Sequence, residues 1–497
     1  MIKKVLIANR GEIAIRIIRA LQDMGLESVA VYSEADRPAR HVRLAHEAYC
    51  LGPAPAAESY LNVDAIMEVA RRSNVQAIHP GYGFLSENAD FAARCKSEGL
   101  IFIGPPPEAI RAMGEKTQAR RIMAQAKVPV VPGTLEAVAT AEEAEREAER
   151  IGYPIMLKAA AGGGGKGMRL VQDPKHLAAA FRDASSEAVK AFGDGSVYLE
   201  RAITKPRHIE MQIIADGQGN VVYLGERECS IQRRHQKVVE EAPSPLVSKS
   251  LRENMGEVAV RAAKAVGYTN AGTIEFLVDE SGDFYFMEMN TRLQVEHAVT
   301  EMITGIDLVK EQIRIAAGEP LSFRQKNVSL RGWAMECRIY AEDPENQFMP
   351  CPGKVVAVRL PEGPGVRVDS SVYSGGEISL HYDPMVAKVV SWGRDRDACA
   401  ATMRRALTEF QIVGIRTNRN FLLQIISHPE FLAGKLDTGF IPRFLGVKEY
   451  RSPEPHVVAD LAAAIYAYES SRREEPEPKG GSGPSAWRRA ALWRGLP

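Results

Sequence analysis

Two acidic residues near the middle of the chain could together hold a cation. Segment 272–290 has two strongly apolar runs on either side of Ser281-Gly282, the pattern of a β-hairpin. If those two residues form the turn, Glu275 falls directly opposite Glu288 on one face. Facing carboxylates among apolar neighbours need a cation or a shared proton. Mg²⁺, which takes oxygen ligands, fits this pair together with Asn290 on the same face, whereas an exposed edge ribbon would leave both acids in solvent.

The residues after this hairpin could hold an oxyanion. Arg292, Gln294 and Glu296 alternate with Leu293 and Val295. If the strand continues, the polar set lies on the carboxylate side and the apolar pair faces inward. A guanidinium and an amide can hold a small oxyanion, and a carboxylate can remove a proton from it. A surface ladder of salt bridges explains these residues equally well.

A glycine-rich stretch could close over phosphates. Gly162, Gly164 and Gly167 match GxGxxG, but a β-type run follows instead of a helix, which argues against a dinucleotide site. The context of Lys166 is not that of a Walker A loop. A strand, a glycine run and a second strand make a hairpin whose N–H groups can approach phosphate oxygens, with Lys158 and Lys166 adding charge. A mobile surface turn is the alternative.

A second polar cluster spans residues 226–237 and lies between apolar runs. It contains Gln232, His235 and Lys237, which together could bind an anion or a nucleotide. The same residues could form a solvated loop, with His235 as an ordinary hydrogen-bonding histidine.

The elements that must position these residues follow from apolar periodicity. Buried-strand runs at 5–8, 28–32, 77–79 and 101–103, with helical stripes between them, predict an open, mostly parallel α/β domain up to about residue 115. Short strands alternating with Gly/Pro turns predict a β-rich domain over 331–446. Between these domains we expect helix 136–150, strands 154–158 and 168–171, helix 174–192, strand 196–200 and further strands to about 330; a helix at 457–468 and a disordered segment at 474–485 follow.

Composition limits the class of protein. A chain of 497 residues is too long for one core and suggests about three domains. Lys+Arg and Asp+Glu balance at 63 each, so no basic surplus points to a nucleic-acid partner. The six cysteines form no CxxC pair, which argues against a zinc ribbon or a disulfide framework. The sequence contains neither a secretory h-region nor a membrane-length apolar run, and a cytoplasmic protein with no membrane partner is expected.

Seven motifs in order make residues 2–446 resemble the biotin carboxylase family of ATP-grasp enzymes. They occupy residues 8–14, 79–88 (His-Pro-Gly-Tyr-Gly-Phe-Leu-Ser-Glu-Asn), 113–116 (Met-Gly-Glu-Lys), 158–167, 233–241, 288–297 (Glu-Met-Asn-Thr-Arg-Leu-Gln-Val-Glu-His) and 336–339 (Glu-Cys-Arg-Ile). The resemblance implies a Rossmann-like α/β domain at 1–115 and an ATP-grasp domain at 116–330 with a mobile lid at about 131–203. It also implies a β-rich C-terminal domain at 331–446. For residues 447–497, beyond the resemblance, the residues themselves predict a helical, flexible tail.

The resemblance also implies which residues bind ATP and metal. Glu275, Glu288 and, more loosely, Asn290 would bind Mg²⁺ or Mn²⁺, in agreement with the register argument. The residues that would contact ATP are Lys116, Lys158, Gly164, Gly165, Lys166, Glu200, Arg201, Ala202, Ile203, His208, Gln232, His235, Glu275 and Glu288.

The implied first step activates bicarbonate. Arg292, Gln294 and the backbone of Val295 would hold bicarbonate while Glu296 removes its proton. The anion would then attack the γ-phosphate of ATP, and Lys237 would stabilise the charge that develops around carboxyphosphate.

The implied second step carboxylates biotin. Carboxyphosphate would release CO₂, and its phosphate would deprotonate biotin N1′. Arg338 would oppose the charge of the resulting enolate, and Tyr82 would pack near the biotin ring. Ala298 stands where a proline usually follows the Glu-His pair, Lys166 replaces an arginine found in some members, and the spacing from Glu275 to Glu288 is one residue longer than in some.

The partners are implied in the same way. Since the chain lacks a Glu-Ala-Met-Lys-Met carrier motif, we expect one subunit of an acetyl-CoA, acyl-CoA or pyruvate carboxylase. It would act as a homodimer, together with a biotin carboxyl carrier protein and a carboxyltransferase subunit. Segments 338–343 and 381–388 favour the pyruvate or acyl-CoA branches. Another ATP-grasp ligase, of the carbamoyl-phosphate or purine type, and a non-catalytic nucleotide sensor are the alternatives.

Overall fold

The computed structural model describes residues 2–160, 168–446 and Ile465. The chain divides into a unit of residues 1–447 and a second unit of residues 448–497, and all described residues except Ile465 belong to the first. The glycine-loop residues Gly164, Gly165 and Lys166, the predicted tail helix apart from Ile465, and the predicted disordered segment lie outside the described residues.

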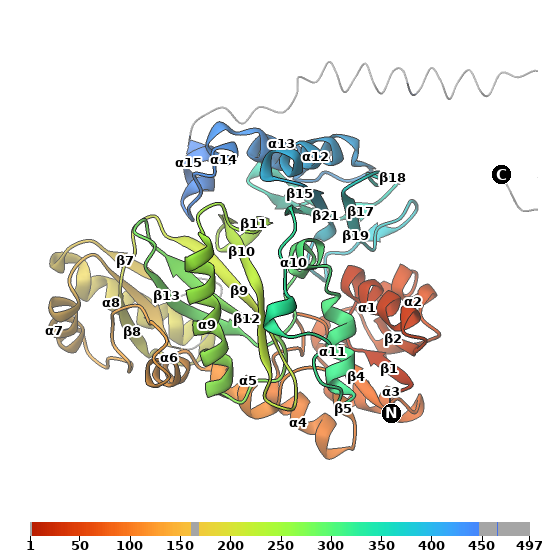
Figure 1. Cartoon of the computed structure of the whole chain (residues 1–497), viewed down its shortest axis with the longest axis horizontal. Helices are drawn as coiled ribbons and strands as arrows, with labels where there is room; N and C mark the ends of the chain where they lie inside the picture. The colour runs from red at the N-terminus through yellow and green to blue at the C-terminus, as the bar shows by residue number, and fades with distance from the viewer. Residues whose placement is uncertain (1, 161–167, 447–464, 466–497) are drawn as a thin grey trace, which may run out of the picture. The chain divides into compact units, whose positions relative to one another are not determined.

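A five-stranded parallel sheet forms the N-terminal part (Figure 1), in the order β3-β2-β1-β4-β5. Val5 and Ile7 pack with helix α1 on one face, and Leu6 packs with α3 on the other. Helices on both faces explain why these strands are apolar throughout, and the four predicted strands are confirmed. The elements are β1 (Lys4–Ile7), α1 (Gly11–Asp23), β2 (Glu27–Ser33), α2 (Arg40–Leu44), β3 (Glu47–Gly52), α3 (Val63–Arg72), β4 (Ala77–His79), α4 (Ala89–Ser97), β5 (Ile101–Phe102) and α5 (Pro107–Gly114).

A long antiparallel sheet dominates the rest of the unit, in the order β13-β12-β9-β10-β11-β14-β21-β19. Ile209, Phe276 and Phe286 project from one face of its first three strands and pack with Val258 of α9. Each buried phenylalanine contributes on the order of 1.5–3 kcal/mol. The elements are α6 (Lys116–Gln125), β9 (Arg207–Ala215), β10 (Val221–Arg233), β11 (Gln236–Ala242), α9 (Lys249–Ala265), β12 (Asn270–Val278), β13 (Phe284–Asn290), α10 (His297–Thr304) and α11 (Leu308–Ala316).

The opposite face of these strands is polar although it is also buried. On β9, His208, Glu210 and Gln212 alternate with the apolar residues and are at most 6% exposed. Because side chains alternate along a strand, the apolar face forms the core with α9 and the polar face is available for chemistry.

A smaller three-stranded sheet, β7-β6-β8, carries two helices. The predicted helix 136–150 begins later than expected, at Ala141. Thr140 caps it by accepting a hydrogen bond from the Glu143 N–H, and Val138 still pairs as extended chain with Val197. The elements are α7 (Ala141–Ile151), β6 (Ile155–Ala159), β7 (Arg169–Val171), α8 (Leu177–Phe192) and β8 (Val197–Arg201).

The C-terminal segment extends the long sheet. The β-rich C-terminal segment that we expected over 331–446 is confirmed; three of its strands continue the eight-stranded sheet, and four helices accompany them. The proposed domain boundaries stay a prediction. The strands are β14 (Trp333–Tyr340), β15 (Glu342–Asp343), β16 (Met349–Pro350), β17 (Gly353–Lys354), β18 (Ala357–Arg359), β19 (Val366–Ser370), β20 (Glu377–Ile378), β21 (Met385–Gly393) and β22 (Gln411–Val413), and the helices are α12 (Arg396–Glu409), α13 (Arg419–Ser427), α14 (Pro429–Leu432) and α15 (Phe440–Gly446). Within the described residues, no helix has both the length and the apolar character needed to cross a bilayer.

Candidate active site

The two predicted carboxylates face each other. Glu275 on β12 pairs directly with Glu288 on β13, and the Asn290 amide donates a hydrogen bond of 2.8 Å to Glu275 Oε1. Glu275 is 3% exposed and Glu288 is half-buried. The predicted pairing of Glu275 with Glu288 is therefore confirmed.

The expected two-residue turn behind that prediction is wrong. Val278 pairs with Phe284, and the Asp279 N–H donates to the Asp283 carbonyl, so the connection is longer and contains Gly282 at φ 90°. This shifts the register by one residue near the turn. A β-bulge at Met287, between the Phe276–Phe286 and Glu275–Glu288 pairs, shifts it back.

One ammonium group joins three buried acids. Lys237 Nζ lies 2.6 Å from Glu210 Oε2, 2.9 Å from Glu275 Oε1 and 2.6 Å from Glu296 Oε1. Burial alone would lower the pKa of Lys237, but these three charges hold it well above its ordinary value. Lys237 is therefore a fixed cation between the paired carboxylates and Glu296.

The cluster that contains Lys237 is not a loop. Residues 226–233 belong to β10 and residues 236–242 to β11, and only Arg234 and His235 connect the two strands. Both have positive φ, of 50° and 65°, as a two-residue hairpin turn requires. Lys237 thereby projects from a strand, whereas His235 is exposed in the turn.

Glu288 is the member of the acidic pair best suited to meet a cation. Burial and the charge of Glu275 raise the pKa of Glu288, with Lys116 acting in the opposite direction. Glu275 already receives hydrogen bonds from Asn290 and Lys237 and lies 2.8 Å from His208 Nε2. A magnesium ion beside Glu288 would relieve the repulsion between two acids, and carboxylate oxygens are donors that it accepts, so the residues present fit such an ion.

The oxyanion candidates do not continue the strand. β13 ends at Asn290, and irregular chain leads into α10, so the predicted alternation beyond Asn290 is wrong. Arg292 nevertheless turns back: its NH1 donates to Gln294 Oε1 and its NH2 to Asn290 Oδ1, each at 3.0 Å. Its Nε donates to Glu87 Oε2 at 2.7 Å, a contact that the sequence did not indicate.

Glu296 and Arg338 come together from distant segments. Arg338 NH2 on β14 lies 2.9 Å from Glu296 Oε2 and 2.5 Å from Glu240 Oε1. Burial would raise the pKa of Glu296, but Lys237, Arg338 and Arg227 hold it well below its ordinary value. Glu296 is therefore a carboxylate whose two oxygens each meet a different cation.

The nucleotide candidates form two neighbouring groups. Lys158 Nζ lies 2.5 Å from Glu200 Oε2, and Arg120 also pairs with Glu200. Burial lowers the pKa of Lys116, which also responds to the charges of Glu288, Lys158 and Glu200, so Lys116 connects this group with the paired carboxylates.

In the second group, Gln232 Nε2 and His208 Nδ1 lie 2.7 Å apart, beside Glu275. Arg201, Ala202 and Ile203 follow Glu200 at the partly exposed end of β8, and His235 is exposed in the turn between β10 and β11.

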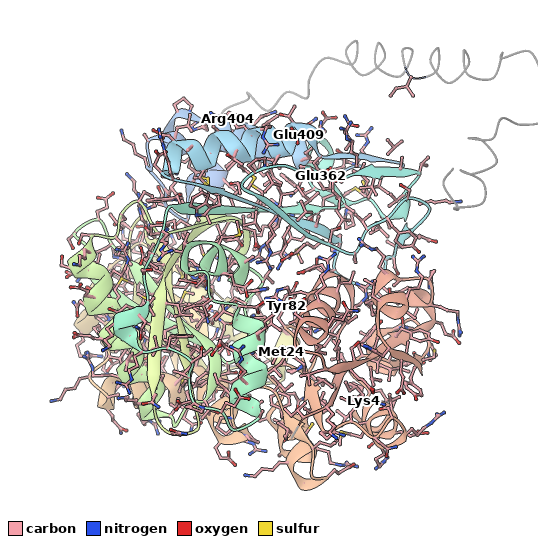
Figure 2. The ribbon with its side chains drawn as sticks, turned by 45° about the vertical axis from the view of Figure 1, so that its right-hand side comes forward. Lys4, Met24, Tyr82, Glu362, Arg404 and Glu409 are labelled. Atoms are coloured by element: carbon pink, nitrogen blue, oxygen red, sulfur yellow. The ribbon has the colours of Figure 1, made fainter. Side chains whose placement is uncertain are left out.

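Tyr82, which Figure 2 labels near the middle of the molecule, lies close enough to Arg338 for its pKa to respond to that charge. Its hydroxyl donates to Glu12, and burial, Glu12 and Glu336 raise its pKa while Arg338 opposes that shift. The carbonyl of Val295 accepts a hydrogen bond of 2.8 Å from Lys388 Nζ.

Several charged residues of the site were missed. Glu210 binds both Lys237 and Arg227, and Glu240 binds Arg338. The signal for Glu210 was present: His208, Glu210 and Gln212 alternate with apolar residues in a buried strand. Glu87 and Lys388 lie in segments 79–88 and 381–388, which the resemblance singled out, but their contacts with Arg292 and Val295 are seen only in the three-dimensional structure.

Three sequence profiles cover this architecture. "Biotin carboxylase, N-terminal domain" matches residues 1–110, "Carbamoyl-phosphate synthase L chain, ATP binding domain" matches 115–324, and "Biotin carboxylase C-terminal domain" matches 336–443. A biotin carboxylase from Nostoc sp. is 55% identical over 438 residues, covering 88% of this chain and 98% of that protein. A pyruvate carboxylase subunit from Methanothermobacter thermautotrophicus is 52% identical over 491 residues, covering 95% and 100% respectively.

A solved structure shares the arrangement. The biotin carboxylase domain of Hydrogenobacter thermophilus 2-oxoglutarate carboxylase, in complex with MgADP, ADP and bicarbonate, superposes with a TM-score of 0.87 at 47% identity. The match covers 91% of this chain and all of that one. With the profiles on both sides of the ATP-binding segment, it shows that the chain belongs to the biotin carboxylase family of ATP-dependent ligases.

Proposed function

We propose that this chain carboxylates biotin in two steps, in which different residues on and next to the long sheet bind ATP, activate bicarbonate and bind biotin. The observation that carries the proposal is the position of Lys237, whose ammonium contacts both Glu275 of the paired carboxylates and Glu296. A nucleotide held beside Glu275 is therefore within reach of an oxyanion held beside Glu296.

ATP occupies the space between the two nucleotide groups. Lys116 and Lys158 pair with its phosphates, His208 and Gln232 contact it from β9 and β10, and the chain from Glu200 to Ile203 meets the adenine. Gly164, Gly165, Lys166 and His235 stay predictions. Glu275, Glu288 and Asn290 would hold Mg²⁺ or Mn²⁺, which supplies positive charge against the phosphates when bound.

Bicarbonate lies between Arg292 and Glu296. The Arg292 fork, Gln294 and the Val295 backbone orient it. Glu296, kept ionised by Lys237 and Arg338, accepts its proton. The resulting anion attacks the γ-phosphorus, whose bond to ADP breaks, so that carboxyphosphate forms and ADP leaves. Lys237 then opposes the negative charge that builds up on the transferred group.

Biotin enters on the Arg338 side. Carboxyphosphate breaks into CO₂ and phosphate, the phosphate takes the N1′ proton, and the N1′ nitrogen then bonds to CO₂ to give carboxybiotin. The guanidinium of Arg338, 8% exposed, opposes the enolate charge in a site with little water. Tyr82 borders the same space. The biotin is attached to a carrier protein, and the chain works as a homodimer with a carboxyltransferase subunit. The final acceptor is acetyl-CoA, another acyl-CoA or pyruvate.

Release of ADP should require bicarbonate and increase with free biotin. Glu296→Gln should lower biotin carboxylation about 10²–10⁴-fold, as expected for loss of a general base. Glu288→Gln should change the magnesium dependence of ATP turnover. Glu311→Gln, which removes a buried acid of α11 bonded to Arg314 and Ser322, is the matched control and should change neither.

Other outcomes would contradict the proposal. Turnover that ignores biotin but responds to an amine or a carboxylate would favour a different ATP-grasp ligase. ATP binding without turnover would favour a nucleotide sensor. An unchanged magnesium dependence in both Glu275→Gln and Glu288→Gln would remove the metal assignment.

A further inference from the structure

Lys388 is a fully buried lysine on β21 that the two proposed steps do not use. Its side chain is 0% exposed, and its Nζ donates a hydrogen bond of 2.8 Å to the carbonyl oxygen of Val295. It also lies 3.2 Å from Glu12 Oε1 and 3.8 Å from Asp369 Oδ2. A lysine is seldom buried completely unless its charge is paired, so these contacts account for its position.

The acid partners keep Lys388 charged. Burial would lower its pKa, but Glu12, Glu336 and Asp369 together raise it above the ordinary value, with Arg367 acting against them. Cross-strand pairing places Lys388 opposite Arg338 on β14 and opposite Asp369 on β19. The ammonium therefore belongs to the same sheet face as Arg338.

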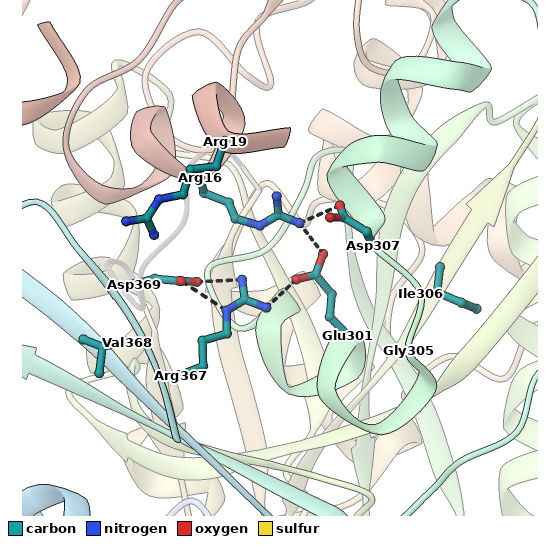
Figure 3. A pocket seen from close by; sticks show the side chains of 9 residues that line it. All are labelled: Arg16, Arg19, Glu301, Gly305, Ile306, Asp307, Arg367, Val368 and Asp369. Atoms are coloured by element: carbon teal, nitrogen blue, oxygen red, sulfur yellow. Dashed lines mark hydrogen bonds and ion pairs between the residues drawn. The ribbon is translucent and has the colours of Figure 1, made fainter. Parts of the chain in front are cut away.

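The acids around Lys388 are themselves fixed. Figure 3 shows Arg367 between Asp369 and Glu301. Arg367 NH2 lies 2.8 Å from Asp369 Oδ2, and its NH1 lies 2.7 Å from Glu301 Oε2. Glu301 Oε1 in turn lies 2.9 Å from Arg16 NH2. This row of alternating charges connects α1, α10 and β19. Because each member is held on both sides, Lys388 has little freedom to move its ammonium.

The carbonyl that Lys388 holds occupies a critical place in the chain. It belongs to the peptide that joins Val295 to Glu296, in the irregular segment between β13 and α10. No strand ladder fixes this segment, since β13 ends at Asn290. A hydrogen bond to the Val295 carbonyl therefore sets the plane of that peptide and the direction from which the Glu296 side chain leaves the backbone.

Lys388 also reaches toward Tyr82. The Glu12 oxygen that pairs with Lys388 accepts the Tyr82 hydroxyl, and the ammonium lies 5.9 Å from the centre of the Tyr82 ring. One cation thus contacts the segment that carries the proposed base and, through Glu12, the side chain expected next to biotin.

We propose that Lys388 is a positioning residue of the carboxylation reaction, which holds the Val295 carbonyl and thereby aims Glu296 at bicarbonate. This inference rests on the proposed function. Lys388 itself touches neither bicarbonate nor nucleotide, so its loss should affect the use of bicarbonate much more than the binding of ATP.

The test is steady-state kinetics of the full chain with free biotin, varying bicarbonate and ATP separately. Lys388→Met should lower kcat/KM for bicarbonate by about 10²-fold, the cost of misplacing a reacting group by about 1 Å. The KM for ATP should change by no more than about 2-fold, much less than kcat/KM for bicarbonate, because Lys388 does not contact the nucleotide groups. Arg252→Met is the control, because it removes a partly buried ion pair with Glu226, at 2.6 Å, outside the site, and should leave both parameters unchanged.

Lys388→Arg keeps the charge and guards against a Met variant that does not fold. A planar guanidinium cannot reproduce the contact of a compact ammonium, so bicarbonate use should again fall while ATP binding stays. Wild-type bicarbonate kinetics in the variants that fold, or an equal rise in the KM for ATP, would overturn the role of Lys388. A wild-type chain that lacks bicarbonate-dependent carboxylation would instead overturn the proposed function together with this inference.

Discussion

Replacing Lys237 by methionine would leave three buried carboxylates without the cation they share. Glu210 and Glu296 are 0% exposed and Glu275 is 3% exposed. After the change, Glu210 keeps Arg227, Glu275 keeps His208 and Glu296 keeps Arg338. Removing one partner of a buried ion pair costs about 3–5 kcal/mol, so the free energy of unfolding at neutral pH should fall by about that amount.

The loss should depend on pH in a definite direction. In the wild type the folded pKa of Glu296 lies well below its ordinary value, so its stabilisation is complete above the unfolded pKa and disappears only as the pH falls through the folded one. Without Lys237, burial pushes this pKa upward, and the variant regains stability by taking up a proton as the pH falls. The difference between wild type and variant should therefore be largest near neutral pH and smaller at acid pH.

Urea unfolding followed by circular dichroism measures this difference, provided that the m-values agree. We would compare midpoints at about pH 8 and about pH 5, on either side of the range over which a raised carboxyl pKa acts. Lys310→Met, which removes a partly exposed lysine that pairs with Asp23 at 2.8 Å, is the control and should leave the midpoint unchanged at both pH values. A Lys237→Met protein as stable as the wild type near neutral pH, or a deficit that does not change with pH, would refute the reasoning.

Three further changes test other parts of the structure. Burial raises the pKa of Glu240 to about 7 although Arg338 opposes it, so between pH 4.5 and about 7 the folded chain binds one proton more than the unfolded chain. The free energy of unfolding should therefore fall as the pH rises through that range, and Glu240→Gln should remove this fall in urea titrations. Phe286→Ala should cost about 3–5 kcal/mol in the same assay, because this ring is 1% exposed in the core beneath α9, and a loss under about 1 kcal/mol would contradict that packing. Gly133→Ala would place a Cβ against the Leu199 carbonyl next to Glu200 and should raise the KM for ATP, whereas Gly217→Ala, which meets open space, should not; equal effects would show that the contact is unimportant.

The pairing of Glu275 with Glu288 was predicted correctly, although the two-residue turn from which we counted the register does not form. Alternation of apolar residues identified both strands of the hairpin. The turn could not be read, since a Ser-Gly pair is compatible with more than one loop length, and here Gly282 adopts φ 90° in a longer connection. The bulge at Met287 happened to restore the register. Bulges depend on how a strand bends over its neighbours, which local sequence does not state.

The residues around Glu296 show where sequence reasoning ends. Continued alternation predicted a strand through Glu296, but the chain leaves the sheet at Asn290 to begin α10. The side chains still reach the site because Arg292 folds back to Asn290. Contacts such as Lys237 with Glu210, or Arg338 with Glu240, join different strands, so only the sheet order reveals them.

That sheet order also decides how separable the parts of the chain are. Dividing the sequence at about residue 330 seemed natural, but β11 pairs with β14, and β14 carries Arg338. Glu296 Oε1 pairs with Lys237, which precedes residue 330, and Glu296 Oε2 pairs with Arg338, which follows it. A chain ending at residue 330 would leave the edge of β11 unpaired and remove Arg338 and Lys388 together. The proposed base would then lose the cation at its Oε2 and the lysine that holds the carbonyl of its own segment, so the site depends on strands from both sides of residue 330.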